Sequence, residues 1–109
     1  MRICTWNINS VRLRAPIVQD LMRQHEPDIV CLQETKTPND KFPHDAFTQL
    51  GYTHHHIDGI KGYNGVAILS KRPLKDVQVY SRVDREDGRH ISAAFTVDGF
   101  AKPIEVHCI

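Results

Sequence analysis

The sequence predicts an α/β protein with a mixed sheet, and three observations support this class. Apolar runs rich in β-branched residues flank a segment of helical periodicity near the start of the chain. Strand, helix and strand follow there at the spacing of a right-handed crossover, which makes the two strands parallel. Later segments alternate polar and apolar residues, as antiparallel strands do. With 109 residues, 40% of them hydrophobic, the chain can form one globular domain or part of one.

The first three elements follow from the pattern of apolar residues. Residues 3–8 are β-branched, aromatic or otherwise apolar until Asn7, which predicts a strand buried on both faces with a polar end. A helix is predicted over about 11–25; it ends before Pro27, because proline cannot continue a helix and restricts the residue before it. Residues 28–32 then form the second strand.

The later elements are shorter. Pro43 in a first helical turn and Gly51 as a left-handed cap predict a short helix between them. Residues 52–57 and 66–69 are expected to be strands joined by a glycine-containing loop. Residues 90–97 predict a half-buried antiparallel strand. Its two faces alternate, with Ile91, Ala93, Phe95 and Val97 on one and His90, Ser92, Ala94 and Thr96 on the other.

The end of the sequence lies inside a predicted element. Residues 104–109 begin another alternating strand, and no turn residue follows it. Domain boundaries normally fall in exposed linkers. We therefore expect residues 1–109 to be an incomplete domain, truncated within a strand at the carboxyl end.

Composition narrows the class of protein without choosing a function. The formal net charge is +1, so any contact with nucleic acid must come from a local patch of Lys and Arg. No apolar run has the length of a signal peptide core or approaches the ~20 residues of a membrane span. We expect a cytoplasmic protein with no membrane contact. Its three cysteines, Cys4, Cys31 and Cys108, lie in apolar runs and are expected to be reduced core thiols.

Asn7 and Glu34 are the first candidates for a functional site. Parallel strands end at the same edge of a sheet, where open α/β sheets bind ligands, so the two residues are expected near each other. An amide oxygen and a carboxylate suit Mg²⁺, which takes one or two carboxylates plus waters and phosphate oxygens. By residue type alone, a turn-capping Asn and a solvated loop Glu are the more common explanation of such a pair.

Four ordered segments carry a family resemblance: TWNINSVR at 5–12, PDIVCLQETK at 27–36, GYNGVAILS at 62–70 and GRHI at 88–91. Together they resemble the exonuclease III family of abasic-site endonucleases over the whole chain. The resemblance implies the amino-terminal part of a four-layer DNase I-like α/β sandwich. It also implies a DNA-repair nuclease that hydrolyses phosphodiesters with Mg²⁺, or Mn²⁺, as an abasic-site endonuclease and 3′-5′ exonuclease. The implied partner is double-stranded DNA with abasic sites or 3′ ends, and the full-length protein is implied to be a monomer.

The resemblance also implies roles for particular residues. Glu34 ligates the metal, and Asn7 helps to hold both the metal and the scissile phosphate. Lys36 supports that carboxylate or neutralises phosphate charge, although a surface lysine is the alternative. Three further substrate-binding candidates are Asn9, Tyr63 and Arg89. Tyr63 could instead be a packed loop aromatic, and Arg89 a solubilising residue at a strand edge.

No catalytic base or histidine is implied within this segment, because the family's later motifs fall beyond Ile109. We therefore expect the 109-residue chain alone to be inactive. Two alternatives stay open: another phosphodiesterase of the same superfamily, and a non-catalytic, truncated DNA-binding fragment.

A run of three histidines could indicate a metal site and Trp6 a base-stacking site, but we expect neither. His54, His55 and His56 are consecutive in a predicted strand, so their side chains alternate between faces and cannot all meet one metal ion. We expect them on the strand surface. Trp6 is expected to pack in the core, because no aromatic or basic neighbours form a base-stacking groove with it.

Overall fold

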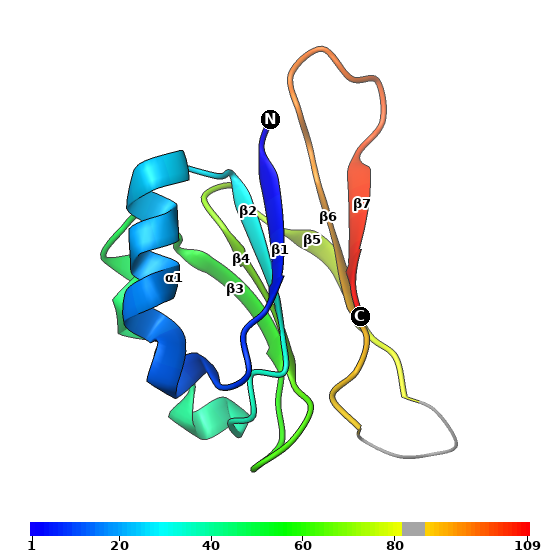
Figure 1. Ribbon diagram of the computed structural model, residues 1–109. Helices are drawn as coiled ribbons and strands as arrows, with labels where there is room; N and C mark the ends of the chain where they lie inside the picture. The colour runs from blue at the N-terminus through cyan, green and yellow to red at the C-terminus, as the bar shows by residue number, and fades with distance from the viewer. Residues whose placement is uncertain (82–86) are drawn as a thin grey trace.

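The computed structural model describes residues 1–81 and 87–109, and its strands form two sheets. The first sheet has the order β1-β2-β4-β3 and the second β5-β6-β7. Figure 1 shows α1 against one face of the first sheet and the second sheet across its other face. The α/β class with two sheets is confirmed. In chain order the elements are β1 (Ile3–Asn7), α1 (Val11–His25), β2 (Ile29–Gln33), the 3-10 helix η1 (Asn39–Lys41), α2 (His44–Thr48), β3 (His54–Asp58), β4 (Val66–Ser70), β5 (Lys75–Val79), β6 (Ile91–Phe95) and β7 (Ile104–Cys108).

The predicted crossover from β1 through α1 to β2 is confirmed. The two strands are parallel, and Asn7 at the end of β1 is opposite Gln33 at the end of β2. Helix α1 begins where the Ser10 hydroxyl accepts a hydrogen bond from the Leu13 amide at 3.4 Å. It ends at His25 and is capped by Glu26, which has the left-handed φ of 46° and precedes a proline.

Two apolar cores lie on opposite faces of the first sheet. Alternate residues of β2 point to opposite sides, so Val30 and Leu32 face the helices while Ile29 and Cys31 face the second sheet. All four are buried. The helical core also contains Val18, Phe47, Tyr52 and Leu69, and the core between the sheets contains Ile68, Ile91, Phe95 and Cys108.

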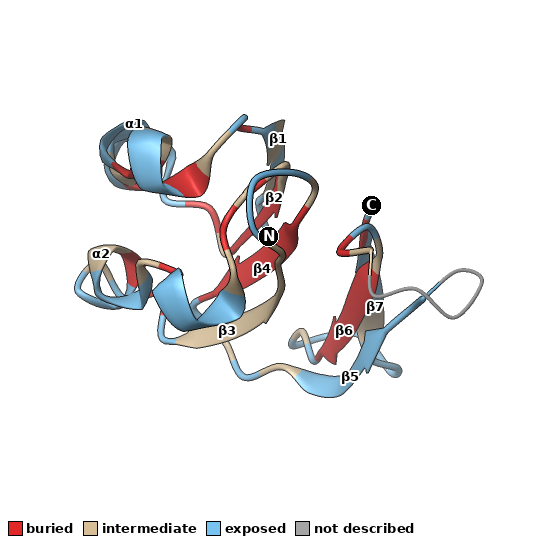
Figure 2. Ribbon diagram, turned by 90° about the horizontal axis from the view of Figure 1, so that it is seen from below, coloured by how far each residue is buried: buried red, intermediate tan, exposed pale blue. Residues whose placement is uncertain are grey.

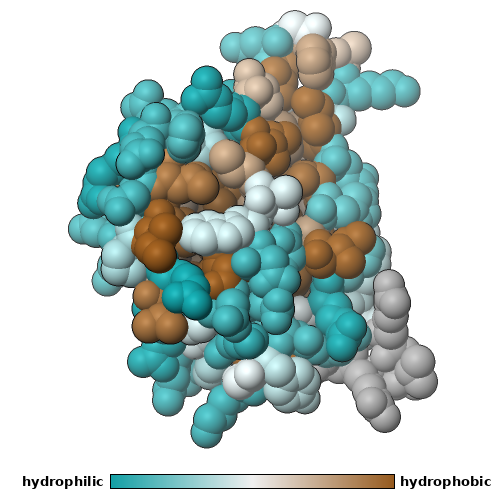
Figure 3. All heavy atoms as spheres, viewed as in Figure 1, coloured by the Kyte–Doolittle hydropathy of each residue, from teal (hydrophilic) through white to brown (hydrophobic). Residues whose placement is uncertain are grey.

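Strand β1 is not buried on both faces, and that prediction is wrong. Ile3 and Thr5 are paired with Ile29 and Cys31 of β2, so they face the side on which the second sheet lies. However, β1 is an edge strand, and Ile3 is 43% exposed. The second sheet covers β2 and β4 but does not extend over β1. Figure 3 shows apolar residues on this open side, between α1 and the second sheet.

The prediction of a half-buried β6 is also wrong. All five residues of β6 are buried, including Ser92 and Ala94 on the face that the sequence pattern makes polar. β6 is the central strand of its sheet, and the small side chains of this face are covered by larger neighbours such as Tyr80, whose hydroxyl lies 3.0 Å from the Ser92 hydroxyl. β5 is a strand that the sequence pattern does not predict, and all its residues are exposed (Figure 2).

The cysteines are free thiols, as expected. Cys31 and Cys108 are buried between the sheets, and Cys4 is half-buried against the helical core. Hydrogen bonding with Cys108, together with burial, raises the pKa of Cys31 above its ordinary value, so this thiol stays protonated at neutral pH. Among the described residues, no helix has the length and apolar character needed to cross a bilayer.

Candidate metal and phosphate site

Asn7 and Glu34 meet at the edge where β1 and β2 both end, as the crossover predicts. They line one pocket of about 170 Å³. Arg89, which comes from the segment that leads into β6, lines the same pocket. The structure therefore brings three of the six predicted site residues together, although they are separated by up to 82 positions in the sequence (89 − 7).

Lys36 connects two more of the predicted residues. Its ammonium group donates a hydrogen bond to Asn9 Oδ1 and lies 3.9 Å from Glu34 Oε1. The Glu34 side chain is 43% exposed, so this ion pair is screened by solvent and serves mainly to orient the two groups. Tyr63 is 62% exposed and lies beside the pocket residue Asn64, without lining the pocket itself.

Backbone strain is concentrated at this edge. Seven non-glycine residues of the described chain have positive φ, and five of them belong to the loops around the pocket: Asn9, Ser10, Glu34, Lys36 and Asn64. Each such residue costs on the order of 1 kcal/mol and persists only where the surrounding structure holds it, which is common at binding sites. The strained residues and the candidate side chains therefore lie at the same edge of the first sheet.

Main-chain hydrogen bonds hold these strained loops together. The Ser10 amide donates to the Glu34 carbonyl at 2.8 Å, and the Lys36 amide donates to the Asn64 carbonyl at 2.8 Å. The loop after β1 is thereby joined to the loop after β2, and the latter to the loop before β4. Side chains carried by these loops have little freedom to move relative to one another.

Gly65 allows the loops after β2 and before β4 to touch. It has a φ of +97°, and a Cβ at this position would lie 2.0 Å from the Thr35 hydroxyl oxygen. Thr35 is buried, so it cannot move aside easily. A larger residue at 65 would push the segment carrying Glu34 out of place.

The donor atoms at this edge suit a hard cation. Glu34 supplies a carboxylate and Asn7 an amide oxygen, and both reach the same pocket. Within the described ranges, no group of three or more His, Cys, Asp or Glu residues could hold a metal ion. A site with a single carboxylate fits a cation of the Mg²⁺ type, which completes its coordination with waters and phosphate oxygens, better than it fits zinc.

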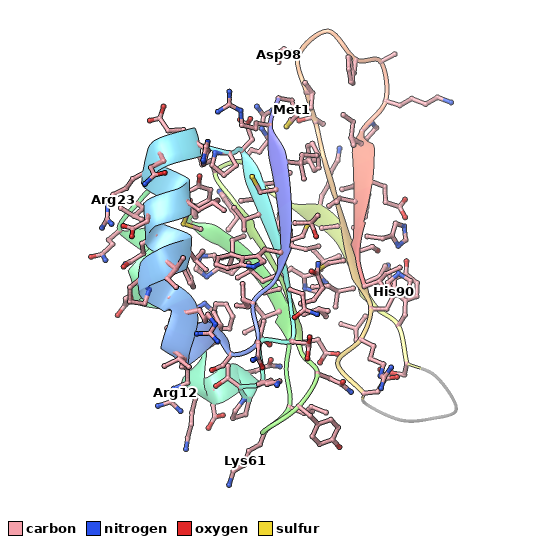
Figure 4. All side chains as sticks on the ribbon, viewed as in Figure 1. Met1, Arg12, Arg23, Lys61, His90 and Asp98 are labelled. Carbon is pink, nitrogen blue, oxygen red and sulfur yellow. The ribbon has the colours of Figure 1, made fainter. Side chains whose placement is uncertain are left out.

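A basic groove lies next to this pocket. It has a volume of about 510 Å³, and Lys36 lies on its wall. Arg12 and Lys61 project from the end of the molecule where the site lies (Figure 4). Lys41 and the polar residues Ser10 and Thr37 complete the polar lining. The sequence pattern does not identify Arg12, Lys41 or Lys61 as site residues, because they are scattered over three segments that come together only in the fold.

The three consecutive histidines are half-buried and not fully on the strand surface, and His55 and His56 have different partners, as the alternation of a strand predicts. His55 Nδ1 lies 2.7 Å from His44 Nδ1, and His56 Nε2 lies 2.9 Å from the Gln78 carbonyl oxygen. Burial lowers the pKa of His55 below its ordinary value. Trp6 packs against the helical core, which confirms its expected structural role.

The described chain is a two-sheet α/β fold with a carboxylate and an amide at the carboxyl ends of two parallel strands. Comparison with known proteins defines the class further. The model of the endonuclease/exonuclease/phosphatase family matches residues 4–107, and the chain belongs to this family. It is 34% identical over 90 residues to exodeoxyribonuclease III of Haemophilus influenzae, a match that covers 82% of this chain and 33% of that protein.

Solved structures agree with the sequence comparison. An AP endonuclease from Archaeoglobus fulgidus is 44% identical, with a TM-score of 0.77 over 85% of this chain and 36% of that one. A 3′ phosphatase from Neisseria, bound to a product DNA hairpin, is 44% identical, with a TM-score of 0.81 over 91% of this chain and 38% of that one. The chain spans about a third of the length of these relatives. Nucleases of the exonuclease III type are metal-dependent in general.

Proposed function

We propose that this chain forms the metal- and phosphate-binding part of a DNA-repair phosphodiesterase of the exonuclease III type. The observation that carries the proposal is the shared pocket of Asn7, Glu34 and Arg89, which places an acidic group and a basic group at the same sheet edge. A nuclease needs both, because the scissile phosphate must be held while charge builds up on its oxygens.

Glu34 and Asn7 are proposed to hold one divalent cation, Mg²⁺ or Mn²⁺. When bound, such an ion supplies Lewis-acid stabilisation of the phosphoryl oxygens. Lys36 has a supporting role: it lies beside the Glu34 carboxylate and hydrogen-bonds Asn9, so it keeps both side chains directed to one side.

The proposed substrate is double-stranded DNA with abasic sites or 3′ ends, cleaved by abasic-site endonuclease and 3′-5′ exonuclease activity. Arg89 binds a backbone phosphate at the pocket, and Asn9, Lys36 and Tyr63 bind the backbone nearby. The basic groove with Arg12 and Lys61 continues this surface. Charge on this scale makes binding depend strongly on salt concentration.

Activation of the attacking water is assigned to residues outside this segment. Each reported relative is about three times as long as the chain, and among the described residues Glu34 is the one acidic side chain of the pocket, which contains no histidine. We propose that the groups that activate water correspond to residues in the portion of the relatives that this chain does not match, and that the complete enzyme is a monomer.

The metal role can be tested by nuclear magnetic resonance. Mn²⁺ bound at the site should broaden the amide signals of residues near Asn7 and Glu34, and Glu34→Gln should abolish this broadening. Glu26→Gln is the matched control, because Glu26 is also an exposed Glu with a left-handed backbone (φ 46° against 53°) but lies at the C-terminus of α1. Equal broadening in wild type and Glu34→Gln would show that Glu34 does not hold the ion.

A further inference from the structure

The segment that carries Arg89 leads into the second sheet, whereas Asn7, Glu34 and most other pocket residues come from the first sheet and its loops. Residues 87–89 precede β6, and the loop that faces them, residues 59–65, joins β3 to β4. Arg89 reaches the pocket only if residues 87–89 are held in a fixed position relative to residues 59–65.

Two adjacent carbonyl groups of the Arg89 segment accept hydrogen bonds from two adjacent residues of that loop. Asn64 Nδ2 donates to the Asp87 carbonyl oxygen at 2.9 Å, and the Gly65 amide donates to the Gly88 carbonyl oxygen at 2.8 Å. The Asn64 bond is partly buried, so water competes for it less than at an open surface.

The approach of the two segments is close. A Cβ at Gly88 would lie 3.2 Å from the Gly65 nitrogen and 3.2 Å from the Asp58 carbonyl oxygen. Rotation of the Arg89 segment away from the loop would disturb both hydrogen bonds, because the bonded carbonyls belong to consecutive residues. The contact thus defines one orientation of the segment.

Asn64 also connects this contact to the metal side of the pocket. Its own carbonyl oxygen accepts the hydrogen bond from the Lys36 amide, two residues after Glu34. Its φ is +54°, a region that Asn occupies more readily than most residues. One residue therefore bonds the Glu34 loop through its backbone and the Arg89 segment through its side chain.

We propose that Asn64 is a positioning residue, which holds the Arg89 segment at a set distance from the Glu34 loop. It contacts neither metal nor substrate in this role. The assignment of Arg89 to phosphate rests on the proposed function, but the positioning itself is a property of the folded chain and can be measured without metal or DNA.

The most specific variant is Asn64→Gly. Glycine adopts the same positive φ without strain, so the substitution removes the amide donor and leaves the backbone conformation available. The matched control is Gln19→Ala, which removes a similar side-chain-to-backbone bond, Gln19 Nε2 to the Ala46 carbonyl at 2.8 Å, far from the pocket.

Hydrogen exchange measured by nuclear magnetic resonance tests the positioning. In Asn64→Gly the Gly65 amide, which is bonded to the Gly88 carbonyl, should exchange about tenfold faster, as expected for the loss of one supporting hydrogen bond. Exchange of the Ile68 amide in β4 should change less than about twofold. Gln19→Ala should leave both rates unchanged. An unchanged Gly65 rate in Asn64→Gly overturns the proposal.

Measuring the affinity for a short duplex DNA tests whether Asn64 acts by positioning Arg89. If Asn64 acts by placing Arg89, then Asn64→Gly and Arg89→Ala should each weaken binding, and the double variant should be no weaker than Arg89→Ala alone. Additive losses would overturn the positioning of Arg89 by Asn64. If wild type binds no DNA while the exchange result holds, the proposed function fails and the positioning stands.

Discussion

The two sheets differ in how completely they are covered. In the first sheet, β2 and β4 are buried by helices on one face and by β6 and β7 on the other, and the loops at one end carry the strained site residues. In the second sheet, the central strand β6 is buried on both faces, whereas β5 is exposed throughout and β7 is half-exposed (Figure 2). The site is thus built mainly on the better-packed sheet, which can support strained loops, while the second sheet contributes Arg89.

The largest difference between the sheets is expected from core truncation. Leu32→Ala, in the middle of the first sheet, should lower the free energy of unfolding by about 3 kcal/mol, because Leu32 is fully buried. Val106→Ala in β7 should cost only about 1 kcal/mol, because Val106 is already partly exposed. Urea unfolding followed by circular dichroism measures both. Equal losses would mean that the second sheet is as well packed as the first.

Gly65→Ala should have the next largest effect, and it tests whether close packing supports the strained loops. Gly65 and Gly51 have nearly the same φ, +97° and +96°, but a Cβ at Gly51 meets nothing within 4 Å. Gly51→Ala therefore measures backbone strain alone, about 1 kcal/mol. Gly65→Ala should cost about 2 kcal/mol or more, because Thr35 must also move. Identical thermal unfolding of the two variants would argue against the tight contact.

Asp28 should make the first sheet sensitive to acid. Hydrogen bonding from the Arg2 amide, together with Arg72, holds the pKa of Asp28 below its ordinary value. As the pH falls, the Asp28 carboxylate is protonated at a higher pH in the unfolded state than in the folded state. Its contribution to the free energy of unfolding is therefore present above pH ~4 and is lost as the pH falls below that value. Asp28→Asn should be less stable than wild type at pH 6, and this difference should shrink towards pH 3. A difference that is constant with pH would contradict the assignment.

The smallest effect is expected on the outer face of the second sheet. Glu105 accepts a hydrogen bond from His107 Nε2 at 2.6 Å, but its side chain is 61% exposed. Glu105→Gln should therefore change the free energy of unfolding by less than about 0.5 kcal/mol. A loss above about 1 kcal/mol in urea unfolding would show that this face is more tightly organised than its exposure indicates.

Part of the candidate site could be predicted from local patterns. Asn7 and Glu34 follow two parallel strands, and the chain direction alone brings the ends of such strands to one edge. Arg12, Lys41 and Lys61 could not be predicted as site residues, because their shared groove depends on how three separate segments meet. The bond from Asn64 to Asp87 could not be predicted either, since it joins residues 23 positions apart in different sheets.

The sequence by itself determined the β1-α1-β2 unit, the α/β class and the residues at the ends of the first two strands. Periodicity, proline and chain direction act over short distances, so these features can be identified before the fold is known. Only the tertiary structure decided which strands are central and which lie at an edge. The central strand β6 is therefore buried on both faces, although its sequence alternates between polar and apolar residues. The edge strand β1 is open on one face, although its sequence is mostly apolar.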